Sequence, residues 1–77
     1  MIVYLLCYRY DQWKTLHAWR PISVCKTLDK AMEVAQSEVS KQPLNWKDEQ
    51  VIIGWTAHCT RENSLLTLQI MLFEVTE

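Results

Sequence analysis

The fold is decided by one stretch, Leu65-Leu66-Thr67-Leu68-Gln69-Ile70-Met71-Leu72-Phe73. Successive side chains of an extended chain point to opposite faces, so four aliphatic residues would share one face: Leu66, Leu68, Ile70 and Leu72. The opposite face would carry Leu65, Met71 and Phe73, with Thr67 and Gln69 between them. Because both faces are largely apolar, both need cover, and the sequence predicts one helix to supply it. The second face is therefore a candidate binding surface.

The composition indicates one small domain, and we take residues 1–77 as a single unit. Hydrophobic residues make up 49% of the chain and charged residues 22%, which excludes an intrinsically disordered chain. With one glycine and two prolines, the chain should be mostly regular structure. A chain this short is marginally stable unless it is tightly packed or oligomeric.

Four stretches rich in strand-forming residues predict strands, at residues 2–10, 16–25, 51–59 and 65–75. Pro21 has no backbone donor, so the second strand should lie at a sheet edge or be bulged there. Gly54 indicates a close approach or a bulge in the third strand. The composition of residues 61–64 predicts a turn.

The clearest element is a helix over residues 27–41. Thr27 can cap its first turn, Asp29 suits a helix N-terminus, and Pro43 would stop it. Apolar residues recur at the spacing of a buried helical stripe: Leu28, Ala31, Met32, Ala35 and Val39.

These elements predict an α+β fold of ββαββ order, with a four-stranded, mainly antiparallel sheet and one helix packed on one face. Two strand orders fit the sequence equally well, 2-1-3-4 and 2-1-4-3. A helix about 10 Å wide cannot cover a sheet roughly 19 Å across, so one face is left over. The expected helix-side residues are Val3, Leu5, Ile22, Val24, Val51, Ile53, Leu66, Leu68, Ile70 and Leu72. The expected far-face residues are Tyr4, Leu6, Tyr8, Trp19, Ile52, Thr56, Met71 and Phe73, and a one-residue slip would exchange the sets of any strand.

The sequence leaves three ways in which the far face could be buried. A second copy of the chain could close it, a different protein could bind it, or loops 11–15 and 43–50 could fold under it with Trp13 and Trp46. Large aromatic side chains dominate interface energetics. We therefore take the following residues as interface anchors, with Trp46 at the rim: Tyr4, Tyr8, Trp19, Met71 and Phe73.

No catalytic, cofactor or metal site is predicted. His58 and Cys59 are adjacent, but neighbours on a strand point to opposite faces and cannot act on one atom. The two histidines and the three cysteines lack the tight spacing of zinc ligands. A single glycine excludes the usual phosphate-binding loops. We expect a protein without enzymatic activity.

Binding of single-stranded RNA or DNA is the alternative, because a sheet with surface aromatics can stack bases. Such a platform would use Tyr8, Tyr10, Trp19, Arg9 and Arg20. Eight basic residues are offset by nine acidic ones, so the sequence favours a protein partner over nucleic acid.

The cellular location is inferred from what the sequence lacks. Residues 1–10 show no basic segment followed by a long apolar run, and no apolar run is long enough to span a membrane. We expect a cytoplasmic protein whose cysteines are reduced and act as small hydrophobic residues.

The order of elements, and the helix opening Thr27-Leu28-Asp29-Lys30-Ala31 followed by Ala35, resemble those of small phage and mobile-element proteins. Some anti-CRISPR inhibitors are among them, and bacterial housekeeping domains share the same layout. The resemblance implies a small inhibitor of a host defence protein that acts by occupying a surface, and it assigns no functional residue. Together these inferences predict a protein-binding module that forms a homodimer.

Overall fold

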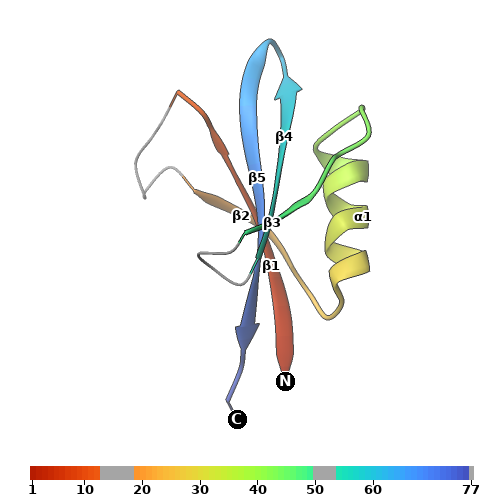
Figure 1. The fold of residues 1–77 in the computed structure, drawn as a ribbon, viewed down its shortest axis with the longest axis vertical. Helices are drawn as coiled ribbons and strands as arrows, with labels where there is room; N and C mark the ends of the chain where they lie inside the picture. The colour runs from red at the N-terminus through yellow and green to blue at the C-terminus, as the bar shows by residue number, and fades with distance from the viewer. Residues whose placement is uncertain (13–18, 50–53, 77) are drawn as a thin grey trace.

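The structure is a computed structural model that describes residues 1–12, 19–49 and 54–76. Within these residues, five strands form one twisted sheet and a single helix lies on one side of it (Figure 1). The strands are β1 (Ile2–Tyr10), β2 (Arg20–Cys25), β3 (Lys47–Glu49), β4 (Gly54–Arg61) and β5 (Ser64–Glu74), and the helix is α1 (Leu28–Glu38).

The sheet has the order β2-β1-β5-β4-β3, and every neighbouring pair is antiparallel. The α+β class with an antiparallel sheet is therefore confirmed, and the four longer strands follow the second predicted order, 2-1-4-3. The prediction of four strands was wrong in number. It missed β3, whose residues Lys-Asp-Glu include none of the β-branched or aromatic types that mark a strand. The predicted third strand began at residue 51, and residues 51–53 lie outside the described part of the chain.

β5 is the central strand. It pairs with β1 along residues 2–10 and with β4 along residues 54–61, so it has no free edge. Three of its residues are completely buried: Leu66, Leu68 and Ile70. The stretch that is apolar on both faces therefore has a neighbouring strand on each side.

The pairing register fixes which residues share a face, because residues directly opposite each other point the same way. On β5 the prediction was correct, with Leu68 toward the helix and Met71 away from it. On β1 it was wrong, since Leu6 lies opposite Ile70 and Leu5 lies opposite Met71. The helix side of β1 therefore carries Tyr4, Leu6 and Tyr8, and the far face carries Val3, Leu5 and also Val24 of β2.

The core lies between α1 and the sheet. Its buried members are Leu6, Cys25, Ala31, Ala35, Ala57, Cys59, Leu66, Leu68 and Ile70. The predicted anchors Tyr4 and Tyr8 and the predicted rim residue Trp46 are half-buried and pack against this cluster. Trp46 therefore does not fold under the far face, and Trp13 lies outside the described residues.

The helix begins as predicted and ends earlier. Lys30 N–H donates to Thr27 Oγ1 over 3.1 Å, which caps the first turn. After Glu38 the N–H groups of Val39 and Ser40 still donate to the Ala35 carbonyl, and the chain beyond them is held by Gln36. The Gln36 amide donates to the carbonyls of Ser40 and Gln42, and it accepts from Leu44 N–H.

Three backbone predictions are confirmed. β2 is an edge strand, and its register with β1 shifts next to Pro21. A Cβ atom on Gly54 would lie 2.5 Å from the carbonyl oxygen of Ile70, so this glycine serves a close approach of backbone. Glu62 and Asn63 have φ values of 51° and 65°, as in a type I′ hairpin turn.

We predict that Gly54→Ala lowers the free energy of unfolding by about 1–3 kcal/mol, because the new methyl group would collide with the backbone of the central strand. Chemical denaturation measures the change. Thr60→Ala, at an exposed position of the same strand, should leave the midpoint nearly unchanged. Equal midpoints for Gly54→Ala and the native chain would contradict the close approach.

Candidate functional site

The far face of the sheet carries an exposed apolar patch, which we define as Val3, Leu5, Val24, Met71 and Phe73. Leu5 lies opposite both Val24 and Met71, and Val3 lies opposite Phe73, so the five side chains adjoin one another across three strands. Val24 is 64% exposed and Phe73 46%, and the other three are partly exposed. Nothing among the described residues buries this patch.

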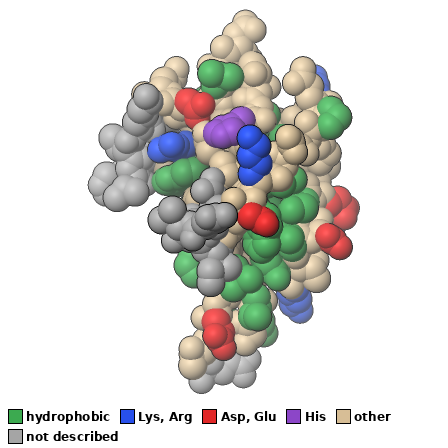
Figure 2. All heavy atoms as spheres, viewed as in Figure 1, with side chains coloured by type: hydrophobic (Ala, Val, Ile, Leu, Met, Phe, Trp, Pro, Cys, Tyr) green, Lys and Arg blue, Asp and Glu red, His purple; other side chains and the backbone are tan. Residues whose placement is uncertain are grey.

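Beyond the patch, the same face becomes polar and basic. We define the basic strip as Arg9, His58 and Lys47. Arg9 and His58 lie opposite Thr67 on its two sides, and Lys47 lies opposite Thr56, two residues from His58 on the same face. Figure 2 shows a histidine between two basic side chains, with hydrophobic side chains gathered below them.

A chain of hydrogen bonds links His58 to Thr67 and Asp11. Thr67 is 6% exposed, and its hydroxyl donates to Asp11 Oδ1. His58 Nδ1 lies 3.3 Å from the same hydroxyl oxygen. Since the hydroxyl has one proton and gives it to Asp11, His58 Nδ1 must be the donor to Thr67. The neutral ring therefore carries its proton on Nδ1, and the lone pair of Nε2 is left for solvent or a partner.

This arrangement does not activate a nucleophile. In a hydrolase the hydroxyl donates to the histidine, which removes the proton as the oxygen attacks. Here the Thr67 hydroxyl receives a bond from His58 and donates to a carboxylate, and it is nearly buried. The bonds among these three residues fix the orientation of the His58 ring.

Arg9 is held against Trp19. Its guanidinium carbon lies 4.9 Å from the centroid of the Trp19 ring, within the range of a cation–π contact. Its Nε is buried and has no hydrogen-bond partner among the described atoms. The contact places Trp19 on the far face, as predicted. The residues expected to form one base-stacking platform are divided, since Tyr8 and Tyr10 lie on the helix face.

The cysteine thiols are poorly suited to chemistry. All three are free and buried. Burial raises the pKa of Cys7 to about 11. Burial also raises the pKa of Cys59, against the smaller opposing effects of the Ser40 hydrogen bond and the Arg61 charge, and the Asp11 charge raises it further. Cys59 lies opposite Leu66 on the helix face, so it is separated from His58, as predicted.

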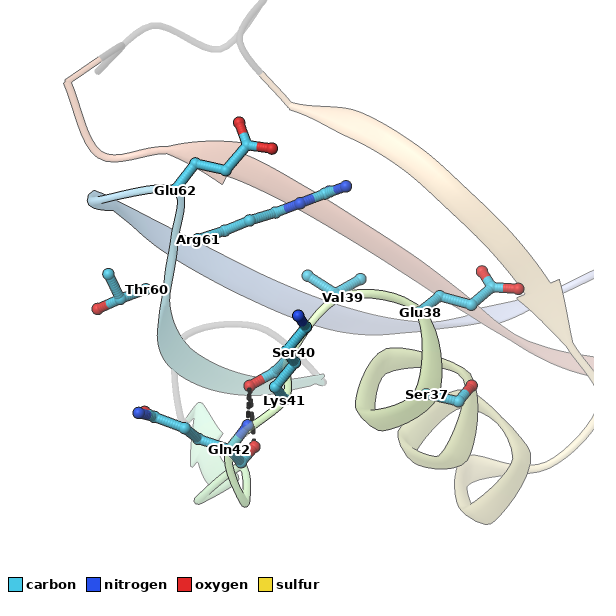
Figure 3. Close-up of a pocket in the computed structure, with 9 residues that line it drawn as sticks. All are labelled: Ser37, Glu38, Val39, Ser40, Lys41, Gln42, Thr60, Arg61 and Glu62. Carbon is cyan, nitrogen blue, oxygen red and sulfur yellow. Dashed lines mark hydrogen bonds between the residues drawn. The ribbon is translucent and has the colours of Figure 1, made fainter.

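A groove of about 490 Å³ lies between the end of α1 and the β4–β5 hairpin (Figure 3). It is lined by Ser37, Glu38, Val39, Ser40, Lys41, Gln42, Thr60, Arg61 and Glu62. Arg61 reaches from the hairpin toward the helix, whereas Thr60 points away from it (Figure 3). Two cations and two anions line the groove, so its charge favours no class of ligand. The part of the chain that the structure describes contains no cluster of three or more His, Cys, Asp and Glu side chains that could hold a metal ion.

The predicted anchors are thus distributed over both faces. Met71 and Phe73 lie in the apolar patch and Trp19 lies beside the basic strip. Sequence reasoning missed the bond between Asp11, Thr67 and His58, because these residues are far apart in the chain. The one available signal was Thr67 itself, a hydroxyl within the most apolar stretch of the sequence.

The chain matches no protein family model, no curated protein and no solved structure. The one helix that the structure describes, α1, has neither the length nor the apolar composition to cross a membrane. The functional argument therefore rests on the surfaces just described.

We predict that Thr67→Val changes the tautomer of His58. In the native chain the neutral His58 ring should carry its proton on Nδ1. In the variant the Thr67 oxygen that accepts this proton's hydrogen bond is gone, so the ring should show the mixture of Nδ1–H and Nε2–H tautomers typical of exposed histidines. Ring ¹⁵N chemical shifts distinguish the two forms. The variant should also lose about 1–3 kcal/mol of stability, because Asp11 loses its hydroxyl partner. An unchanged ring spectrum would contradict the proposed direction of these bonds.

We predict that Cys7 and Cys59 resist alkylation by iodoacetamide at pH 8 in the folded protein. The thiolate is the reactive form, and a pKa of about 11 leaves about one part in a thousand of Cys7 ionised at that pH. Mass spectrometry of labelled peptides measures the rate, with the urea-unfolded chain as the control. Equal rates for folded and unfolded protein would show that these thiols are accessible.

Proposed function

We propose that this chain is a non-enzymatic protein-binding module that docks a partner protein on the far face of its sheet. The observation that carries the proposal is the exposed apolar patch, in which Val24, Leu5 and Met71 form one row across three strands. A sheet face that meets water normally carries polar side chains. A contiguous exposed apolar area is typical of an interaction site.

A second copy of the chain fits this face less well than a different protein. A two-fold dimer through the whole face would either oppose two basic strips or press each strip against an apolar patch. Both arrangements would bury the charged side chains of the strip, which costs free energy unless each of them finds a partner. The patch alone has five residues, whereas a stable interface uses roughly 20–30 on each side. We therefore favour a partner that meets both the patch and the strip.

The mode of action follows from the same surface. A docking face without a reactive group can block a protein by occupying its surface. This supports the inhibitor that the resemblance to small phage proteins implies. The orientation of the Thr67 hydroxyl and the raised thiol pKa values of Cys7 and Cys59 agree with a non-enzymatic role.

Nucleic-acid binding is less well supported. Stacking of bases needs free aromatic faces, and on the described far face Phe73 offers one whereas the Trp19 ring is already covered by Arg9. The aliphatic side chains of Val24, Leu5 and Met71 suit a protein surface better than a run of bases.

We predict that peptides selected against this chain bind at the patch. A random peptide library would be selected on the immobilised chain, and the enriched peptides would be tested on Phe73→Asp and on Ile2→Asp. Ile2 is 50% exposed but lies on the helix side of β1, opposite Glu74, so it is a matched control. Phe73→Asp should weaken binding about tenfold or more, since aromatic anchors commonly contribute at least that much. Ile2→Asp should not weaken it.

Peptides that bind Phe73→Asp as well as the native chain would contradict a site at the patch. Light scattering over a hundredfold dilution tests whether a second copy of the chain covers the face instead. A dimer that persists in the native chain and dissociates in Phe73→Asp would show that a second copy covers the face. Circular dichroism would confirm that both variants keep their fold.

A further inference from the structure

We propose that the outer edge of β4 is a second binding site, which takes an extended segment of another protein as an added strand. The site is separate from the far face, because it is formed by backbone groups of His58 and Thr60 and by the groove beside the β4–β5 hairpin. A sheet edge with unpaired backbone donors and acceptors is a template for a further strand.

The direction of the backbone groups in the sheet follows from the pairing of β1 with β5. The Met1 ammonium donates to the Val75 carbonyl over 3.2 Å, and Val75 N–H donates to the Met1 carbonyl over 2.7 Å. At the other end of the same ladder, Asp11 N–H donates to the Leu65 carbonyl over 2.9 Å. Bonded and non-bonded pairs alternate along antiparallel strands, so the odd-numbered residues of β5 bond to β1 and the even-numbered ones bond to β4.

Two residues of β4 therefore have open backbone groups. Even-numbered residues of β5 lie opposite odd-numbered residues of β4, so the even-numbered residues of β4 point their N–H and C=O groups away from β5. β3 pairs with residues 54–56 of β4, and this ladder ends because β3 begins at Lys47. Beyond it, the backbone N–H and C=O groups of His58 and Thr60 have no hydrogen-bond partner among the described residues.

This open edge adjoins the groove at the end of α1. Thr60 lines the groove on one side, and residues 37–42 line it on the other (Figure 3). The second wall is held in place, because the Gln36 amide donates to the carbonyls of Ser40 and Gln42 over 3.1 and 2.7 Å. A strand of about five residues, which is about 17 Å long, would span both open residues of β4.

The chemistry and shape of the site select its occupant. The binding groups are backbone N–H and C=O, which match the backbone of an extended segment of any sequence. The groove is lined by two cations and two anions, so its charge does not select the side chains of the segment. A second copy of β4 fits poorly, because it would bring its own residues 37–42 against those of the first copy. The occupant is therefore an extended segment of a different protein.

Hydrogen exchange in the free chain tests whether the edge is open. The amide protons of His58 and Thr60 should exchange about tenfold or more faster than those of Ala57 and Cys59, which bond to β5. Equal protection of the two pairs of amides would show that the edge is already closed, and it would overturn the proposal.

The binding test uses a seven-residue peptide of alternating threonine and valine with a lysine at each end, titrated into the full chain and followed by NMR amide shifts. One variant of the peptide is N-methylated at its second and fourth residues, and another at its third and fifth. An added strand points alternate N–H groups toward β4. One variant should therefore bind about tenfold or more weakly, and the other should bind like the unmodified peptide. The amides of His58 and Thr60 should shift and become protected from exchange.

Variants of the protein locate the peptide. Thr60→Pro removes one N–H from the edge, and proline is tolerated on the open side of an edge strand. Its matched control is Thr60→Ala, which keeps the N–H. Thr60→Pro should weaken binding of the unmodified peptide about tenfold, whereas Thr60→Ala and Phe73→Asp should bind it like the native chain. The two N-methylated peptides test the same site on the native chain if Thr60→Pro does not fold.

The outcomes separate this site from the far face. Equal binding of the two N-methylated peptides, or no binding of the unmodified peptide at millimolar concentration, would overturn the added strand. Binding that is lost in Phe73→Asp and kept in Thr60→Pro would place the peptide on the far face, which overturns the edge site and keeps the proposed function. A dimer in light scattering that dissociates in Thr60→Pro would show that a second copy takes the edge, which overturns a different protein as its occupant.

Discussion

The structure depends on the position of one strand that is apolar on both faces. Such a strand would lose much buried apolar area at the edge of the sheet. Placing β5 between β1 and β4 satisfies its backbone along most of its length and surrounds its side chains with those of its neighbours. The single helix then seals one face, where Leu66, Leu68 and Ile70 are completely buried. The helix does not cover the other face of the sheet.

Close packing is achieved by small residues. Ala31 and Ala35 let α1 approach the sheet, and Gly54 lets the backbone of β4 approach the carbonyl of Ile70. The larger rings of Tyr4 and Trp55, with centroids 6.0 Å apart, fill space at the border of this core. The aromatic residues of β1 are thus structural, and those that remain on the open face belong to other segments.

The sequence was informative wherever a residue has one strong physical preference. Thr27 as a cap, Pro21 at an edge and Gly54 at a close approach each act locally, and each was predicted. The faces of β1 could not be predicted, because Val3 and Leu5 alternate with residues that are equally apolar. The strand β3 is set by pairing with β4 and not by its own composition. The bond from Thr67 to Asp11 joins residues 56 positions apart, which no local pattern shows.

The far face combines features that neither a solvated surface nor a core would have. A solvated face would not expose Val24 and Phe73 in a continuous area, and a permanent core would not contain Arg9 with an Nε that has no partner among the described atoms. An apolar centre beside a polar, charged margin is the usual anatomy of an interface between proteins. The bond that orients His58 fits this interpretation, because holding a side chain in place before binding lowers the entropy lost when a partner arrives. The stability of the fold therefore comes from one face of β5, and the binding that we propose would use the other.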